Sequence, residues 1–207
     1  MILLQLALDT PEALAVLPRV APWIDIVEVG TPLLKRFGLA ALATVREIAP
    51  KATLLADSKT VDGGSAESKM LFDAGADLVT VLSCARPATI EAVAREAAAR
   101  GKAVMLDTLT EADPIVVATR AYPDAVRYVA LHTGTDARLA GAATPADSFD
   151  AARRVQTQRE IALAGGIDRE NIAIAVALRP AIIVVGRAIT TAADPEAAAE
   201  WMRESLS

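Results

Sequence analysis

The chain has 207 residues, of which 53% are hydrophobic and 23% are charged, and its formal net charge is −5. This composition is typical of a globular protein and excludes a disordered chain. The negative charge argues against a nucleic-acid partner, and no apolar run approaches the roughly 18 residues that a membrane-spanning helix needs. Cys84 is the only cysteine and no leader segment is visible, so we expect a cytoplasmic protein without disulfides.

Short apolar runs alternate with longer alanine-rich runs along the chain. The apolar runs predict strands, and the alanine-rich runs, several of them ended by glycine, predict helices. Thr10 and Pro11 suit the cap and the first position of the first helix. The predicted strands cover residues 2–8, 24–29, 52–56, 77–82, 103–106, 126–131, 160–163 and 181–185; the predicted helices cover residues 11–21, 38–49, 65–74, 87–100, 111–121, 146–158, 168–177 and 195–206.

This alternation makes eight strand–helix units of about 25 residues each. Eight such units predict an α/β protein, a single (β/α)8 TIM barrel over residues 1–207, with short loops and no separate lid domain. The alternative is an open doubly wound sheet, whose dinucleotide-binding form has a glycine-rich turn after its first strand. Here that turn is Leu8-Asp9-Thr10-Pro11, which contains no glycine.

Three charged residues follow one another where the third apolar run ends. Asp57 and Lys59 are two residues apart, so both side chains point to one face if they lie at the end of a strand. Asp62 comes later, before Gly63-Gly64, and either caps the next helix or reaches into a site. A carboxylate beside an ammonium group at the mouth of a parallel sheet indicates function.

Glu28 lies near the end of the second predicted strand, with apolar residues on both sides. A carboxylate is costly to bury unpaired, so one interpretation is a structural ion pair with Lys59 or Lys35. The other is a metal site, because Glu28 and Asp57 end neighbouring strands and offer only oxygen ligands, which suits Mg²⁺. Zinc is disfavoured because the sequence has no cluster of Cys and His.

Asp9, Asp107 and His132 also follow predicted strands. Asp9 could instead cap the first helix, although Thr10 is available for that role. His132 is the only histidine, and its place between an apolar run and the turn Thr133-Gly134 favours acid/base catalysis over a structural role.

Glycines follow the last two predicted strands, at Gly165, Gly166 and Gly186, and Arg187 comes next. The corresponding loops of barrel enzymes commonly hold a phosphate through backbone N–H groups, and an arginine would add a charge-assisted clamp. The alternative is that these glycines only form tight turns. Together, these residues predict an Mg²⁺-assisted enzyme that acts on a small phosphorylated substrate through an enediolate, which serves aldol, isomerase and decarboxylase reactions alike.

The segment from Asp57 to Asp62 resembles the D-x-K-x-x-D signature of the orotidine 5′-phosphate decarboxylase superfamily. Other segments are similar to those of the 3-hexulose-6-phosphate synthases, which belong to its Mg²⁺-using branch, and the match covers essentially the whole chain. Glu28 argues against orotidine 5′-phosphate decarboxylase itself, which needs no metal and usually has lysine there. The other matching segments are residues 5–9, 27–32, 129–134 and 164–167.

Within that branch, the alternative is 3-keto-L-gulonate-6-phosphate decarboxylase or another sugar-phosphate lyase. Asp107, Thr135 and Ala164 stand where the decarboxylases tend to have glutamate, arginine and threonine, and all three favour a synthase. Asp62-Gly63-Gly64 and Gly186-Arg187 look more like the decarboxylases. A non-catalytic barrel is disfavoured because every catalytic position is filled, and a sugar-phosphate epimerase because a second-face acid or base is missing.

The resemblance implies an aldehyde-lyase that adds formaldehyde to D-ribulose 5-phosphate, and the reverse reaction. It implies that Glu28 and Asp57 bind Mg²⁺. Lys59 would stabilise the enediolate, and His132 would move the proton at the reacting carbon. The residues that would orient substrate hydroxyls or water are Asp9 and Asp107.

The resemblance also implies a homodimer with shared active sites, in which the partner subunit supplies Asp62 and Thr31. In such a dimer, Asp62 would act in the site of the other subunit, which explains its place several residues after the strand. The residues expected to hold the substrate phosphate are Gly165, Gly166, Gly186 and Arg187.

Overall fold

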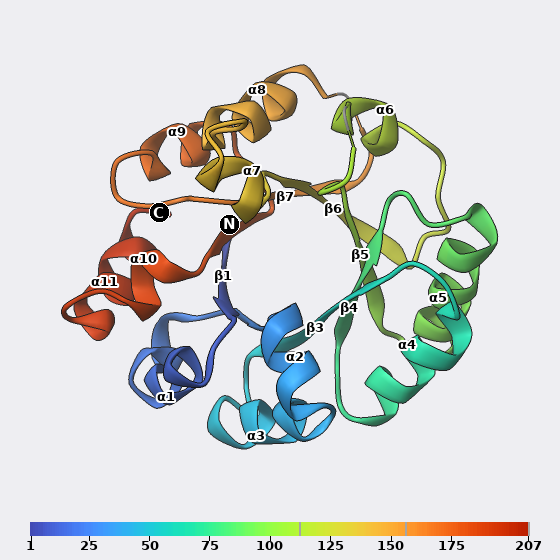
Figure 1. Ribbon diagram of the computed structural model, residues 1–207, viewed down its shortest axis with the longest axis horizontal. Coiled ribbons are helices and arrows are strands. Elements are labelled where there is room, and N and C mark those ends of the chain that lie inside the picture. Colours follow the sequence, from blue (N-terminus) through green and yellow to red (C-terminus); the bar gives the residue numbers. More distant parts are fainter. Residues whose placement is uncertain (112, 156, 207) are drawn as a thin grey trace.

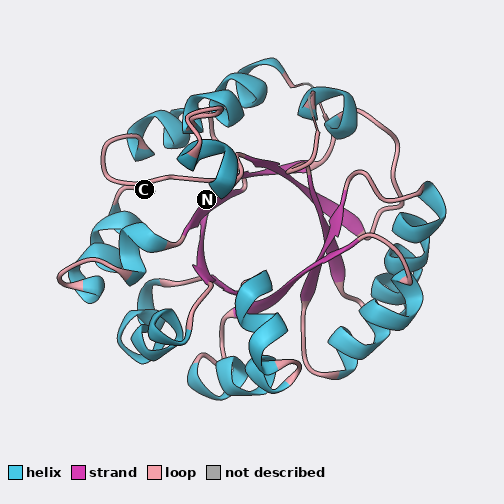
Figure 2. Ribbon diagram, viewed as in Figure 1, coloured by secondary structure: helices cyan, strands magenta, loops and turns pink. Residues whose placement is uncertain are grey.

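The computed structural model describes residues 1–111, 113–155 and 157–206. In these ranges, eight parallel strands pair in sequence order, and β8 pairs with β1 to close a barrel that the helices surround (Figures 1 and 2). The prediction of a (β/α)8 TIM barrel is confirmed, and the open doubly wound sheet is wrong. The strands are β1 (Leu3–Leu8), β2 (Ile26–Val29), β3 (Thr53–Thr60), β4 (Leu78–Leu82), β5 (Ala103–Asp107), β6 (Val126–His132), β7 (Glu160–Ala164) and β8 (Ile182–Val185).

Most helices lie where the sequence predicts them, and the short helices α2, α7 and α10 are additional. No helix in the described ranges is both long enough and apolar enough to cross a membrane. The helices are α1 (Pro11–Val20), α2 (Thr31–Phe37), α3 (Ala40–Ile48), α4 (Gly64–Asp73), α5 (Pro87–Ala99), α6 (Pro114–Ala118), α7 (Thr135–Leu139), α8 (Pro145–Arg154), α9 (Ile172–Ala177), α10 (Arg187–Thr190) and α11 (Pro195–Glu204), and a 3₁₀ helix, η1, spans Ala21–Trp23.

Capping residues and prolines determine where several helices begin. Thr10 caps α1, as expected, because its hydroxyl accepts a hydrogen bond from the Ala13 backbone N–H at 3.2 Å. The helix predicted over residues 111–121 begins only at Pro114, because the Asp113 side chain accepts a hydrogen bond from the Ile115 backbone N–H and proline is favoured in the first turn. Residue 112 lies outside the described ranges.

Two other helices are shorter than predicted. The helix expected over residues 146–158 ends at Arg154, because Val155 is already extended. Residue 156 of that range is not described. The helix expected over residues 168–177 begins at Ile172, because the Asn171 side chain accepts a hydrogen bond from the Asp168 backbone N–H and closes a turn there.

The third strand is longer than the sequence predicts. β3 continues to Thr60 instead of ending at residue 56, so Asp57 and Lys59 belong to the strand itself. Its register against β4 shifts between Ala56 and Thr60. The charged side chains of Asp57 and Lys59 therefore lie at the C-terminal end of β3, at the mouth of the barrel.

Successive side chains of each strand point to opposite faces of the sheet, and this divides the apolar core into two layers. One layer packs between the barrel and its helices, and the other fills the inside of the barrel. Toward the C-terminal ends of the strands, polar side chains take the place of apolar ones inside the barrel. The apolar inner layer therefore closes the barrel below these polar side chains. The inner layer consists of Ile26, Leu55, Leu78, Met105, Tyr128, Ala130, Ala162 and Ile182.

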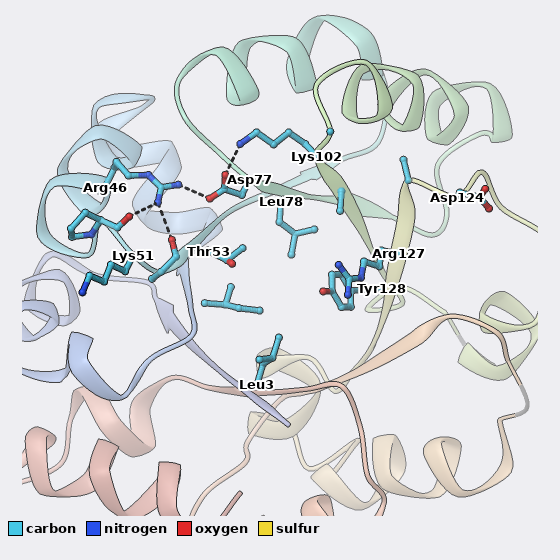
Figure 3. A pocket seen from close by; sticks show the side chains of 16 residues that line it. Leu3, Arg46, Lys51, Thr53, Asp77, Leu78, Lys102, Asp124, Arg127 and Tyr128 are labelled. Carbon is cyan, nitrogen blue, oxygen red and sulfur yellow. Dashed lines mark hydrogen bonds and ion pairs between the residues drawn. The ribbon is translucent and has the colours of Figure 1, made fainter. Parts of the chain in front are cut away.

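A charged cluster lies at the opposite end of the barrel, where the strands begin (Figure 3). Asp77 accepts hydrogen bonds there from Arg46 of α3, from Lys102 and from the backbone N–H of Leu54. Arg46 also donates to the Ala52 carbonyl at 2.9 Å. These contacts join the helix layer to the starts of β3, β4 and β5, beside a cavity of about 580 Å³.

We expect the contribution of Asp77 to stability to depend on pH. Burial alone would raise the pKa of Asp77, but the hydrogen bonds from Lys102, Leu54 and Arg46 hold it below its ordinary value of 3.8. A lowered folded-state pKa stabilises the fold above the unfolded-state value, and this is lost as pH falls through the folded-state value. Asp77→Asn should therefore lower the free energy of unfolding by about 1 kcal/mol at pH 7.

Urea unfolding between pH 7 and pH 3 checks this expectation. The difference between Asp77→Asn and the unaltered protein should shrink below about pH 4. Asp150→Asn, which removes an exposed carboxylate on α8, is the matched control and should change stability by less than about 0.5 kcal/mol. A deficit of constant size across this pH range would contradict the assigned role.

Candidate active site

The polar residues predicted at the strand ends gather at one end of the barrel. Glu28 lies in β2, Asp57 and Lys59 lie in β3, and Asp107 and His132 close β5 and β6. Each continues the inward-facing series of its strand, because alternate side chains of a strand face the same side. This is the end at which barrels of this fold carry their active sites.

Lys59 and His132 are linked by the buried carboxylate of Asp107. Lys59 Nζ lies 2.8 Å from Asp107 Oδ2 and 3.0 Å from Asp57 Oδ1. His132 Nδ1 lies 3.1 Å from both Asp107 carboxylate oxygens. Asp107 therefore orients two other side chains of the site, and its expected role toward substrate hydroxyls or water stays a prediction.

These contacts determine the charges in the site. Burial alone would raise the pKa of Asp107, but His132 and Lys59 outweigh burial and lower it below its ordinary value. Burial alone would lower the pKa of Lys59, but Asp107 and Asp57 raise it above its ordinary value. At neutral pH, Asp107 is a carboxylate and Lys59 is an ammonium group. Because a carboxylate only accepts hydrogen bonds, Nδ1 of His132 carries a proton, and Nε2, which has no hydrogen-bond partner among the described residues, is the nitrogen that faces a substrate proton.

Thr80, which the sequence reasoning missed, holds Asp57 and Lys59 in place. Its hydroxyl donates to Asp57 Oδ1 at 2.8 Å and accepts from the Lys59 backbone N–H at 2.9 Å. Lys59 has a φ of +48°, a left-handed conformation that is unfavourable for a residue with a Cβ. A sequence signal exists, since Thr80 is the only polar residue of the apolar strand Leu78–Leu82.

Glu28 is buried, and its hydrogen-bond partner is another residue that the sequence reasoning missed. Gln5 Nε2 donates to Glu28 Oε2 at 2.6 Å, from an otherwise apolar β1. The structural ion pair considered with Lys59 or Lys35 is not formed in the described part of the chain. Burial, and then the charge of Asp57, raises the pKa of Glu28 to about 8.

The surroundings of Glu28 and Asp57 fit a divalent cation. Two carboxylates repel each other in a buried place, and the ammonium group of Lys59 is already shared by Asp57 and Asp107. Gln5 Oε1 is buried beside Glu28 and has no hydrogen-bond partner among the described residues. The donors are all oxygens, as Mg²⁺ prefers. No group of three or more Asp, Glu, His or Cys side chains forms a metal cage in the described ranges, so water and substrate would complete the coordination.

Thr31 contacts the site of its own chain. Its hydroxyl lies 2.7 Å from Asp57 Oδ2 and 2.8 Å from the Asp57 backbone oxygen. The unpredicted helix α2 places Thr31 against β3. The expectation that Thr31 also serves the site of a partner subunit stays a prediction. Asp62 is exposed and forms no hydrogen bond or ion pair with the site residues described here, so the structure does not bring it into this site.

Asp9 lies at the rim of the site, after β1. Although the residue is exposed, its carboxyl group packs on Gly30, where an added Cβ would come 2.1 Å from Asp9 Oδ1. This desolvation, and then the charge of Asp57, raises the pKa of Asp9. Thr10 caps α1, so the capping role considered for Asp9 is already filled.

The glycines after β7 have backbone conformations that favour glycine. The φ angles are +102° at Gly165 and +79° at Gly166, and a Cβ at Gly165 would come 2.1 Å from the Thr133 carbonyl oxygen. Gly186 follows β8, and the exposed Arg187 begins α10. Turn geometry alone explains Gly165 and Gly166, so phosphate binding by this loop stays a prediction.

Comparison with known proteins places the chain among related barrels. A model of the family described as Orotidine 5'-phosphate decarboxylase / HUMPS family matches residues 3–202. The crystal structure of a 3-hexulose-6-phosphate synthase from Salmonella typhimurium is 40% identical, with a TM-score of 0.92, and the match covers 99% of this chain and 98% of that one. That of a 3-keto-L-gulonate-6-phosphate decarboxylase from Vibrio cholerae is 31% identical, with a TM-score of 0.81, over 99% and 97% of the two chains.

Curated relatives match over the same extent. A 3-hexulose-6-phosphate synthase from Bacillus subtilis is 33% identical over 209 residues, which are 98% of this chain and 98% of that protein. The bifunctional enzyme Fae/Hps of Methanosarcina mazei is 34% identical over 210 residues, which are 99% of this chain and 52% of that protein. The chain thus spans about half the length of the bifunctional relatives that it matches.

We expect the neutral ring of His132 to carry its proton on Nδ1, because the ionised Asp107 can only accept a hydrogen bond there. Nitrogen-15 NMR of the imidazole ring measures this directly, and the single histidine removes any ambiguity of assignment. In Asp107→Asn, the amide can donate as well as accept a hydrogen bond. The fraction of rings that carry the proton on Nδ1 should therefore fall. Asp113→Asn, at the start of α6, should leave the spectrum unchanged. A ring protonated on Nε2 in the unaltered protein would contradict the assignment.

Proposed function

The chain belongs to the orotidine 5′-phosphate decarboxylase / HUMPS family, and we propose that it is a 3-hexulose-6-phosphate synthase. The reaction is the aldol addition of formaldehyde to D-ribulose 5-phosphate, and its reverse, which makes the protein an aldehyde-lyase. One observation carries the proposal: Asp107 joins a charged ammonium group, Lys59, to a ring with a free nitrogen, His132. Aldol chemistry through an enediolate needs such a pair.

His132 acts as the base in this proposal. Its Nε2 accepts a proton from the hydroxymethyl carbon next to the carbonyl group of ribulose 5-phosphate, and the C–H electron pair moves into the enediolate. Asp107 keeps the ring in the required tautomer and stabilises the imidazolium that forms, as carboxylates do beside catalytic histidines. After the enediolate carbon attacks formaldehyde, the imidazolium returns the proton to the new hydroxyl group.

Lys59 acts as the electrostatic partner. It stays protonated because the neighbouring Asp107 and Asp57 raise its pKa. An ammonium group fixed in a largely buried site stabilises the negative oxygen of the enediolate more than it would in water, since it needs no reorganisation during the reaction. Thr80 contributes by holding the Lys59 backbone N–H.

We also propose that Glu28 and Asp57 bind Mg²⁺. The all-oxygen donor set, the mutual repulsion of the two carboxylates and the unpaired oxygen of Gln5 support this assignment. When bound, Mg²⁺ would supply positive charge near the oxygens of the enediolate. Thr31 and Thr80 would orient Asp57 for this role through the hydrogen bonds that they donate to its carboxylate.

A cytoplasmic homodimer with shared sites is the assembly that we propose. Four exposed apolar side chains lie on α2, on α4 and on the segments that follow α2 and β3; Val61 precedes Asp62 directly, and Leu39 and Met70 line one shallow pocket. Pairing of two such surfaces would cover them and would bring Asp62 to the other subunit. The exposed fractions are 44% for Phe37, 36% for Leu39, 52% for Val61 and 50% for Met70.

The second candidate is 3-keto-L-gulonate-6-phosphate decarboxylase. Arg187 and the segment Asp62-Gly63-Gly64 favour it, whereas Asp107, Thr135 and Ala164 favour the synthase. Ala164 is the most informative of these, because it pairs with His132 in the barrel register and is buried beside the reacting group. A threonine there would add a hydroxyl next to the imidazole ring, and this chain lacks it.

We expect formaldehyde consumption when the protein is supplied with ribulose 5-phosphate and Mg²⁺, because His132 and Lys59 can generate the enediolate. The reaction should stop with EDTA and resume when Mg²⁺ is added in excess. A parallel assay with 3-keto-L-gulonate 6-phosphate monitors carbon dioxide. Carbon dioxide release without formaldehyde consumption would reject the synthase in favour of the decarboxylase.

We expect Mg²⁺ to raise the melting temperature of the protein, because only the folded state holds the oxygens of Glu28 and Asp57 together as ligands for the ion. At about 100 times the dissociation constant, such binding stabilises by about 2.7 kcal/mol. Differential scanning calorimetry with and without Mg²⁺ measures the shift. It should vanish in Glu28→Gln and persist in Glu47→Gln, which removes an exposed carboxylate from α3. A full shift in Glu28→Gln would remove Glu28 from the metal site.

A further inference from the structure

One arginine lies over the glycine loop that follows β7, and a second follows the next strand of the barrel. The Arg138 side chain passes directly over Gly166, because a Cβ added at that glycine would come 2.9 Å from Arg138 Nη1 and 3.2 Å from Arg138 Cδ. Arg187 begins α10, after the neighbouring strand β8. The helices α7 and α10 lie on the same side of the barrel, away from α4 and α5 (Figure 1). One cation therefore lies over the loop, and the charge of the second acts on it from the neighbouring strand end.

The described residues offer these cations no counter-charge. Neither Arg138 nor Arg187 takes part in any ion pair of the described part of the chain. Arg138 Nη2 donates only to the neutral hydroxyl of Thr135, at 3.1 Å. Other partly buried arginines, such as Arg46 and Arg203, are each paired with a carboxylate.

Arg138 also carries an unsatisfied donor. Its Nε is buried and has no hydrogen-bond partner among the described residues. Burial, and then the charge of Arg187, holds the pKa of the Arg138 guanidinium below its ordinary value. An unpaired buried donor and a repelling neighbour both destabilise the protein alone, and an anion between the two guanidinium groups removes both penalties.

We propose that Arg138 binds the phosphate group of the substrate and, with Arg187, brackets a phosphate monoester on the Gly165-Gly166 loop. A guanidinium group offers a planar fork of donors that matches phosphate oxygens. Arg138 was absent from the sequence-based expectations, which placed only Arg187 at this end. The identity of the ligand as a sugar phosphate rests on the proposed function, whereas binding of the phosphate group does not.

The distribution of charge around the site supports this assignment. The acidic residues Asp9, Glu28 and Asp57 lie on or after β1, β2 and β3, and the arginines lie after β6 and β8. The two arginines follow the strands on either side of β7, whose loop carries Gly165 and Gly166, whereas Glu28 and Asp57 lie on β2 and β3. A phosphate on this loop would therefore bind apart from the two carboxylates proposed to hold Mg²⁺.

Isothermal titration calorimetry with inorganic phosphate tests the inference without reference to any reaction. Loss of a charged hydrogen-bonding partner should weaken phosphate binding by about tenfold or more in Arg138→Gln. Arg138→Lys keeps the charge but loses the fork, and should lie between Arg138→Gln and the unaltered protein. The matched control is Arg154→Gln, which removes an exposed arginine of α8 that forms no ion pair among the described residues, and it should bind phosphate as the unaltered protein does. Equal affinities in Arg138→Gln and Arg154→Gln would overturn the inference.

Steady-state kinetics with ribulose 5-phosphate and formaldehyde gives a second readout. Arg138→Gln should raise KM by about tenfold and change kcat by less than about threefold, because the phosphate is held equally before and during the reaction. A lower kcat with an unchanged KM would also overturn the inference. If phosphate affinity falls in Arg138→Gln but the unaltered protein consumes no formaldehyde, the phosphate-binding role stands and the proposed synthase activity is rejected.

Discussion

The site depends on one buried carboxylate, that of Asp107, because it is shared by an ammonium group and an imidazole ring. Burial alone would lower the pKa of the Lys59 ammonium group, and the negative charge of Asp107 raises this pKa again. The same carboxylate fixes the proton on one nitrogen of His132 and leaves the other free. Removing one partner of such a buried charged group leaves the other unpaired, which typically costs about 3–5 kcal/mol. Charge state, tautomer and local stability therefore all follow from a single side chain.

The eight strands were predictable because helices cover the outside of the barrel and the inner layer fills it, so each strand is a nearly continuous apolar run. The additional helices α2, α7 and α10 were not predictable in the same manner. They have four to seven residues, which is too short to show a period of 3.6 residues, and they begin directly after loops that also suit turns. The extension of β3 was missed because Asp57, Ser58 and Lys59 are not strand-forming residues by composition.

The candidate site also has a part that the sequence predicts and a part that it does not. Glu28, Asp57, Lys59, Asp107 and His132 could be found from the sequence, because the fold places every strand end at one mouth. Their partners could not be found in this way. Which side chains meet across the barrel depends on strand register and on the register shift between β3 and β4, and neither is visible in the order of residues. The unpredicted contacts of the site, made by Gln5, Thr31, Thr80 and Arg138, all follow from that three-dimensional arrangement.

The left-handed backbone at Lys59 has a consequence for how this chain can change by substitution. Glycine at position 59 would relieve the unfavourable backbone conformation but would remove the amine. Lysine at this position therefore lowers the stability of the fold and supplies the charged group of the site. The Thr80 hydroxyl, which holds the Lys59 N–H, is part of that exchange. Substitutions at these two positions are therefore epistatic: the effect of altering Thr80 differs according to whether a lysine or a glycine occupies position 59. Two adjacent strands of the barrel are thus constrained as one unit, although they are separate in the sequence.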